Sequence, residues 1–146
     1  MGKQLLDTDI LSEVIKGKDK TVAQKAAAYL EAEGRFTTTA VTVAEVVYGF
    51  RRMGREDRIT AFEASLTNVE VVPFDDAAAR IAGRINADLQ GQGRIIGMPD
   101  VMIAAIALHR GLTLVTGNVA HFEYVRALGH DLGINNWRDT PTQAPP

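Results

Sequence analysis

Apolar residues follow two patterns along this chain: stripes typical of helices and short runs typical of buried strands. The longest run, Val101–Leu108, is apolar on every side and predicts a helix packed within the core. Gly111 ends that helix, and residues 112–115 predict a short strand of apolar and β-branched residues. Pro99 and Asp100 stand just before the run, where a helix accepts a proline and favours an ionised carboxylate. The sequence therefore places an acid at the start of a central helix.

The same patterns predict alternating strands and helices through the rest of the chain. We expect strands at 3–6, 35–39, 69–72 and 112–115, with a last short strand near 132–134. We expect helices at 10–17, at 21–33, from 42 past 50, from the charged bend at 51–58 through 66, and from 75 to 89. Short strands separated by helices imply a parallel sheet between helical layers. We predict an α/β protein with three α/β/α layers and a central parallel sheet of four or five short strands.

Two local expectations accompany this architecture. Thr8 or Asp9 can cap the first helix, because both side chains accept hydrogen bonds from free helix N–H groups. The second helix is expected to turn Ala23, Ala27 and Leu30 toward the core, since these residues recur at helical spacing.

The length of 146 residues suits one domain with its own core. We expect that domain at residues 1–138, followed by a loose Pro-rich tail at 139–146. No segment reaches the roughly 18 apolar residues of a membrane span, and the first residues do not form a signal peptide. A cytoplasmic location without membrane contact is therefore the expectation.

The sequence contains no cysteine, which excludes disulfides, zinc–thiolate sites and thiol chemistry. The formal net charge of -2 argues against a basic coat for nucleic acid. It is compatible with nucleic acid held in a local basic groove beside an acidic, metal-loaded centre.

Polar residues gather where the predicted strands end and the next helices begin. Asp7 ends the first strand, Glu45 lies in the first turn after the second, Asp100 starts the central helix and Asn118 follows the fourth strand. All four fall on one edge of a parallel sheet, the edge where ligands bind in open α/β folds. Clustered carboxylates stay ionised together only if a cation neutralises them, and oxygen ligands suit Mg²⁺ or Mn²⁺.

Each of these residues also has a purely structural explanation. Asp7 or Asp9 can cap a helix, Glu45 can be a solvated helix acid, Asp100 can satisfy a helix dipole and Asn118 can form a turn. We favour a functional cluster because three acids and an asparagine at equivalent ends of four units are unexpected as unrelated caps.

Across most of its length the sequence resembles the PIN-domain ribonucleases, specifically the VapC-type toxins of type II toxin–antitoxin pairs. The resemblance rests on the spacing of the blocks LLDTDILSE, TTTAVTVAEVVYGF, IGMPDVMIAAIA, LVTGNVAHFEYV and NNW. It implies a PIN-like fold with Asp7, Glu45 and Asp100 as the acidic catalytic core, and with Asp7 and Asp100 as metal ligands. Thr116 supports the site, and Asn118 joins the catalytic group through the motif at the end of the fourth strand.

The resemblance also implies an activity and its partners. The expected function is a Mg²⁺-dependent endoribonuclease, with Mn²⁺ as a substitute, that cleaves cellular RNA such as tRNA or rRNA by metal-activated water. A cognate antitoxin protein would hold the toxin inactive. The toxin would form homodimers, and with the antitoxin a heterotetramer or larger assembly.

Two departures from the family pattern concern the charge of the site. Position 9 is often asparagine in the family and is Asp9 here, which adds a negative charge. Many relatives carry a fourth acid at the position of Asn118 or three residues later, where this chain has His121. We hypothesise that Asp9 restores the missing charge, and that His121 either orients a phosphate or caps the turn.

Arg51, Arg52 and Arg55, with Arg58 beside them, lie in the charged bend and are candidates for binding the RNA backbone. A solvated bend, with Glu and Asp between the arginines, is the alternative interpretation. Trp137 is expected to anchor the C-terminal end by packing.

Two other functions stay open. An inactive PIN-fold module that grips RNA or antitoxin without cutting would explain the missing fourth acid. An aspartyl-nucleophile phosphatase would explain the D-x-D at 7–9, but such enzymes want Thr or Val where Leu11 stands and a late lysine, and no lysine follows Lys25.

Overall fold

The computed structural model describes residues 2–140, and its five strands are all parallel. Hydrogen bonds join β1 (Gln4–Leu6), β4 (Thr113–Val115) and β5 (Ile134–Asn135) in one group and β2 (Phe36–Thr39) and β3 (Val69–Val72) in another. The Thr38 hydroxyl donates to the carbonyl of Leu6 at 2.8 Å, which fixes β2 beside β1. The strand order across the molecule is therefore β3-β2-β1-β4-β5, with the first strand of the chain in the middle.

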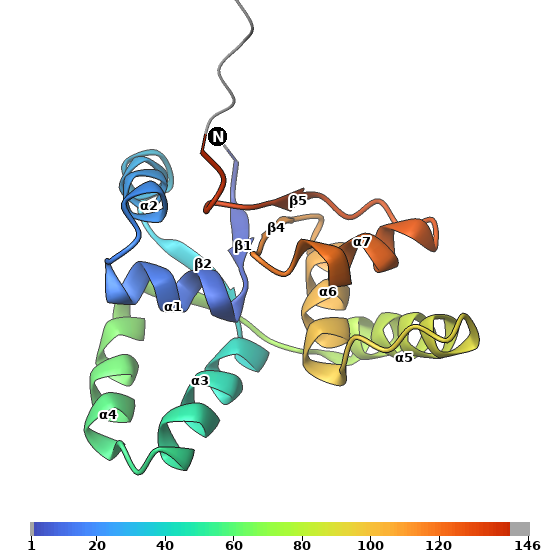
Figure 1. Ribbon diagram of the computed structural model, residues 1–146, viewed down its shortest axis with the longest axis horizontal. Helices are drawn as coiled ribbons and strands as arrows, with labels where there is room; N and C mark the ends of the chain where they lie inside the picture. The colour runs from blue at the N-terminus through green and yellow to red at the C-terminus, as the bar shows by residue number, and fades with distance from the viewer. Residues whose placement is uncertain (1, 141–146) are drawn as a thin grey trace, which may run out of the picture.

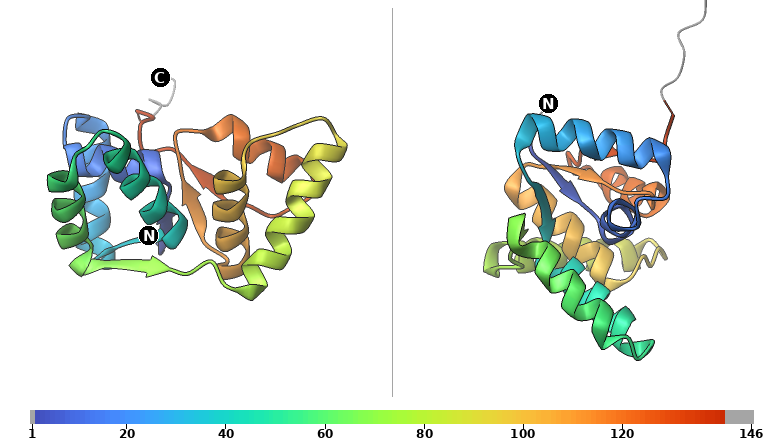
Figure 2. Two further views of the ribbon diagram at one scale, coloured as in Figure 1. Left: turned by 90° about the horizontal axis from the view of Figure 1, so that it is seen from below. Right: turned by 90° about the vertical axis from the view of Figure 1, so that its left-hand side faces the viewer.

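Helices cover both sides of these strands (Figures 1 and 2). They are α1 (Thr8–Lys16), α2 (Lys20–Glu33), α3 (Ala40–Arg52), α4 (Glu56–Ser65), the short 3₁₀ helix η1 (Leu66–Asn68), α5 (Asp76–Gly91), α6 (Met98–Arg110) and α7 (Val119–Ala127). Figure 1 shows α1–α4 on one side of β1 and α5–α7 on the other.

The alternation of side chains along β1 and β4 creates the two cores. Leu5 and Leu114 pack against α5, α6 and α7, whereas Leu6 and Val115 pack against α1, α2 and α4. Neighbouring residues in a strand point to opposite faces, so a strand with a helical layer on each side carries apolar residues on both faces. The predicted three-layer α/β/α architecture is confirmed.

The structure corrects the predicted inner face of α2. Val22, Ala26 and Tyr29 are buried there, while Leu30 is 38% exposed. The predicted face is shifted by one residue toward the C-terminus, because the spacing of the alanines was followed instead of that of the bulkier Val22 and Tyr29. The Tyr29 hydroxyl donates to the carbonyl of Gln4 at 3.3 Å and accepts from its N–H at 3.0 Å, which fixes this face against β1.

Two helix starts also differ from the prediction. Helix α1 begins at Thr8, two residues before the predicted start. Its N-cap is Asp7, as the structural explanation for that acid allowed, and not Thr8 or Asp9. Helix α3 begins at Ala40, two residues before the predicted start, which moves Glu45 from the first turn to the second.

The C-terminal end of the described chain packs as expected around Trp137, which is 2% exposed. The predicted tail at 139–146 lies outside the described residues from 141 onward. Among residues 2–140, the helices are all too short or too polar to cross a lipid bilayer.

Candidate active site

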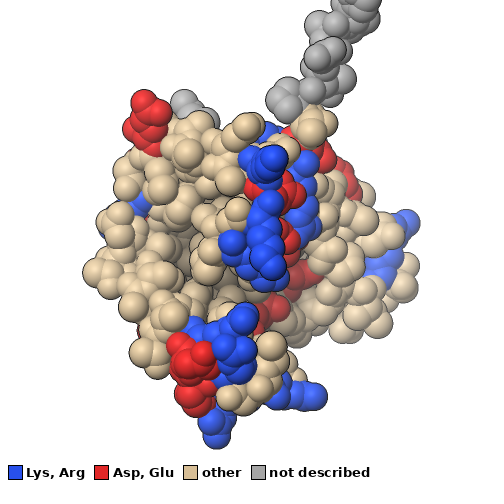
Figure 3. All heavy atoms as spheres, turned by 60° about the vertical axis from the view of Figure 1, so that its left-hand side comes forward, with Lys and Arg blue, Asp and Glu red and all other residues tan. Residues whose placement is uncertain are grey.

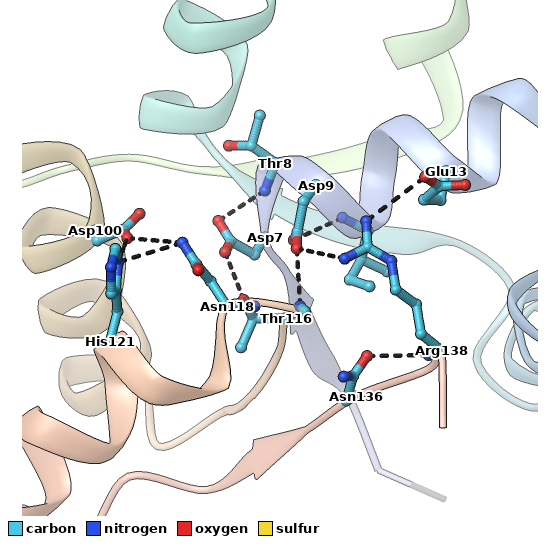
Figure 4. Close-up of polar contacts among 12 residues, drawn as sticks. Asp7, Thr8, Asp9, Glu13, Asp100, Thr116, Asn118, His121, Asn136 and Arg138 are labelled. Carbon is cyan, nitrogen blue, oxygen red and sulfur yellow. Dashed lines mark hydrogen bonds and ion pairs between the residues drawn. The ribbon is translucent and has the colours of Figure 1, made fainter. Parts of the chain in front are cut away.

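The site begins where β1 and β4 end side by side. The N–H of Asp7 donates to the carbonyl of Val115 at 2.9 Å, and the N–H of Thr116 donates to the carbonyl of Asn135 at 2.9 Å. These bonds continue the sheet one residue past each strand. As Figure 4 shows, Asp7 and Thr116 therefore emerge together at the carboxyl edge of the sheet.

Asp7 is the most perturbed acid of the site. Its side chain is 4% exposed, and its two oxygens accept hydrogen bonds from the N–H of Thr8 (2.7 Å) and the hydroxyl of Thr116 (2.8 Å). The pKa of Asp7 is raised to about 7, mainly by burial and to a lesser extent by the negative charges of Asp9 and Asp100, against the lowering effect of the two hydrogen bonds. A buried carboxylate with a raised pKa is stabilised by a cation that takes the place of its proton.

Asp100 lies in the first turn of α6 and meets two residues at the start of α7. Its Oδ2 lies 2.8 Å from Nδ1 of His121 and accepts a longer bond, 3.4 Å, from Nδ2 of Asn118. The same Asn118 nitrogen lies 3.2 Å from Nδ1 of His121. His121 thus contacts the central acid rather than merely capping the turn, a contact that the sequence did not predict.

Glu45 reaches the site through hydroxyl groups. Its Oε1 accepts a hydrogen bond of 2.7 Å from Thr8, whose hydroxyl also lies 3.2 Å from that of Thr42. Thr42 is fully buried and contacts the capping hydroxyl of Thr39 at the start of α3. Glu45 therefore stands beside the residue that follows Asp7, without a hydrogen bond to Asp7 or Asp100 themselves.

Asp9 has partners of its own on the far side of Asp7. Its Oδ1 accepts from the N–H of Ile10 at 2.8 Å, and its Oδ2 accepts from the N–H of Gly117 at 2.9 Å. The guanidinium of Arg138 lies 3.3 Å from that Oδ2 and 3.6 Å from the carboxylate of Glu13. The sequence did not single out Arg138 or Glu13. The expected packing of Trp137 was the one hint that the neighbouring Arg138 has a fixed position.

Most arginines of the charged bend pair with their own neighbours, whereas Arg58 lines a groove beside Glu45. Arg51 pairs with Glu56, and Arg55 holds Asp57 through two bonds of 2.8 and 3.0 Å, which lower the pKa of Asp57 to about 2. Arg52 contacts the hydroxyl of Tyr48. At the bottom of Figure 3, where α3 and α4 meet, basic and acidic side chains lie next to one another. The bend thus resembles the solvated alternative more closely than an RNA-binding patch.

A metal site is not preassembled in the described part of the chain, since no three His, Asp or Glu side chains there are close enough to enclose an ion. The donor chemistry nevertheless fits a divalent cation. Asp7 and Asp100 are carboxylates that repel one another. This repulsion is one of the causes that raise the pKa of Asp7. Mg²⁺ binds in just this manner, through one or two protein carboxylates with water completing its shell.

An apolar groove of about 390 Å³ opens beside Thr8 and Glu45, between α1, α3 and α4. Ile15 and Met53 on its walls are 51% and 63% exposed. Phe50 and Phe62 also line it, and Lys16 and Arg58 add positive charge. An apolar surface of this kind indicates a binding site for another molecule.

The chain is similar to known proteins over most of its length. The family model described as PIN domain matches residues 5–127. The tRNA(fMet)-specific endonuclease VapC of Shigella flexneri is 36% identical over 88% of this chain and 96% of that protein. DNA-bound VapBC of Salmonella typhimurium (TM-score 0.78, 30% identity) covers 94% of this chain and 99% of its own. VapBC-1 of nontypeable Haemophilus influenzae (TM-score 0.78, 28% identity) covers 94% and 100%.

Proposed function

Because the chain belongs to the PIN-domain family, among its VapC toxin ribonucleases, we propose that it is a divalent-metal-dependent endoribonuclease of a toxin–antitoxin pair. The observation that carries the proposal is the buried Asp7 carboxyl with its pKa near 7, beside Asp9 and Asp100 at the sheet edge. An acid perturbed by burial and by neighbouring charge is a recognised sign of a functional site.

We infer that Asp7 and Asp100 hold the cation, with Mg²⁺ as the first candidate and Mn²⁺ as a substitute. When bound, the cation would activate water and steady the phosphodiester. Thr116 and the Thr8 N–H orient the Asp7 carboxylate by donating to its two oxygens. Glu45, oriented by the Thr8 hydroxyl, would accept a proton from the attacking water.

Asn118 and His121 take the place of a fourth acid. Both contact the Asp100 carboxylate, so their role in the proposal is to orient Asp100. This arrangement lowers the negative charge of the site compared with a four-acid centre. A non-cutting RNA-binding or antitoxin-binding module stays the second candidate, because this contact occupies one oxygen of the central acid.

The partners follow from the same family. The proposed antitoxin is a peptide with apolar side chains that fills the groove between α1, α3 and α4, where Ile15 and Met53 are exposed. RNA is the proposed substrate, with tRNA as the first class to test because the Shigella flexneri relative is named for tRNA(fMet). The homodimer and the cytoplasmic location stay predictions.

The test is cleavage of total RNA and of purified tRNA by the antitoxin-free protein in Mg²⁺, Mn²⁺ or EDTA. Defined cuts with metal and none in EDTA support the proposal. Asp7→Asn and Asp100→Asn should abolish the cuts, whereas Asp88→Asn, an exposed acid on α5, should not. Metal binding without any cleavage would favour the non-cutting module, and full activity in EDTA would refute the metal mechanism.

A further inference from the structure

The segment after β5 returns across the molecule to the candidate active site. Trp137 packs against the rings of Tyr29 and Phe36, with centroid distances of 5.5 and 6.4 Å. The Nζ of Lys25 donates to the carbonyl of Asp139 just beyond it. The N–H of Arg138 donates to Oδ1 of Asn136 at 3.0 Å. The backbone on both sides of Arg138 is therefore fixed, and its side chain has a defined place.

That place is against the turn between β4 and α7 (Figure 4). Arg138 Nη1 and the N–H of Gly117 share one oxygen of Asp9, at 3.3 and 2.9 Å. A Cβ atom on Gly117 would lie 2.0 Å from Nη1 of Arg138 and 2.6 Å from Oδ2 of Asp9. Only a residue without a side chain allows the guanidinium to lie so close to the turn.

We propose that Arg138 is a positioning residue of the nuclease site. By pairing with Asp9, it holds the Gly117 turn and so keeps Asn118 and His121 beside Asp100. The proposal rests on the proposed function, since it concerns the same site. The guanidinium also lies 3.6 Å from Glu13, so its charge is already compensated by two carboxylates and is not free to bind a phosphate.

Two observations describe this pair. Arg138 meets the charge of Asp9, an acid additional to Asp7 and Asp100 at this edge of the sheet. Arg138 lies beyond residues 5–127, the part that the PIN-domain model matches. The additional acid and its cationic partner thus form one unit, built from both ends of the chain.

The experiment compares four variants of the full-length, metal-free protein. Arg138→Gln removes the charge, Arg138→Lys keeps it, and Gly117→Ala crowds both the guanidinium and the Asp9 carboxylate. Arg126→Gln is the matched control, because Arg126 is an exposed arginine that pairs with Glu123 on α7. The readouts are the NMR hydrogen-exchange protection at position 117 and, for RNA cleavage in Mg²⁺, kcat and KM.

Arg138→Gln should lower the protection at position 117 about twofold to fivefold, the range that loss of an exposed ion pair allows. Gly117→Ala should lower it at least as much, because its Cβ also displaces the Asp9 carboxylate. Both variants should lower kcat by a similar factor with KM little changed, because the RNA contacts are intact. Arg138→Lys should restore most of both values, and Arg126→Gln should change neither.

Unchanged protection at position 117 in Arg138→Gln would overturn the proposal. So would an equal loss of protection throughout β4, since that would show a general loss of stability. If Arg138→Gln lowers protection but the wild-type protein cleaves no RNA, the proposed function fails while the positioning contact stands.

Discussion

Replacing Asp7 with asparagine should stabilise the metal-free protein at pH 8 and leave its stability almost unchanged at pH 4. The wild-type carboxyl has a pKa of about 7 when folded against an ordinary value of 3.8. The folded state therefore binds this proton more tightly than the unfolded state. Its contribution falls as pH rises from about 4 through 7 and is constant above that.

The shift of roughly 3 pKa units corresponds to about 4 kcal/mol, at 1.36 kcal/mol per unit, lost when the buried Asp7 ionises. Asparagine carries no charge but accepts one fewer hydrogen bond from Thr8 or Thr116, a loss of about 0.5–1.5 kcal/mol. We expect a net gain of about 3 kcal/mol at pH 8, equivalent to a rise in Tm of about 6–12 °C.

Urea unfolding in EDTA, at pH values from 4 to 8, measures the difference between variant and wild type. Groups that titrate in both proteins cancel in this difference. Asp88→Asn, an exposed control, should show no comparable trend. A difference that is the same at pH 4 and pH 8 would show that burial does not raise the Asp7 pKa, and the main support for the site would be lost.

Three further outcomes follow from the same geometry. Thr116→Val should destabilise the metal-free protein by about 1.5–3 kcal/mol at pH 8 and by less at pH 5, because the ionised Asp7 needs the hydroxyl more than the neutral acid does; equal losses in urea unfolding would contradict this. Asp100→Asn should abolish cleavage, and saturating Mg²⁺ should raise its Tm less than it raises the Tm of the wild type. In EDTA the free energy of unfolding of the variant should differ from that of the wild type by about 1 kcal/mol or less. If variant and wild type differ equally with and without metal, Asp100 only stabilises the start of its helix. Met53→Asp should weaken binding of the cognate antitoxin at least about tenfold, as measured by calorimetry, because it buries an unpaired charge in the groove. RNA cleavage should be unchanged, and Met53→Leu is the control. Unchanged affinity of Met53→Asp would place the antitoxin elsewhere.

Periodicity and end signals predicted the order of strands and helices except for α7 (Val119–Ala127), and topology brought Asp7 and Asp100 to one edge. The inner face of α2 was predicted wrongly because alanines recur at the same spacing as Val22 and Tyr29, and only packing against β1 decides between them. Local sequence patterns also could not predict the contact between Arg138 and Asp9. It joins residues 129 positions apart and depends on where Trp137 anchors the chain.

The central place of β1 has a consequence for how the protein is made. β1 is synthesised first, yet its neighbour β4 pairs with it in the register Gln4 to Thr113. The hydroxyl that orients Asp7 belongs to Thr116, 109 positions later. Contacts of such long sequence separation form late in folding, and a chain growing from its N-terminus cannot make them early. The nascent polypeptide therefore leaves the ribosome with its acids unassembled, and the site matures only when the last quarter of the chain has emerged.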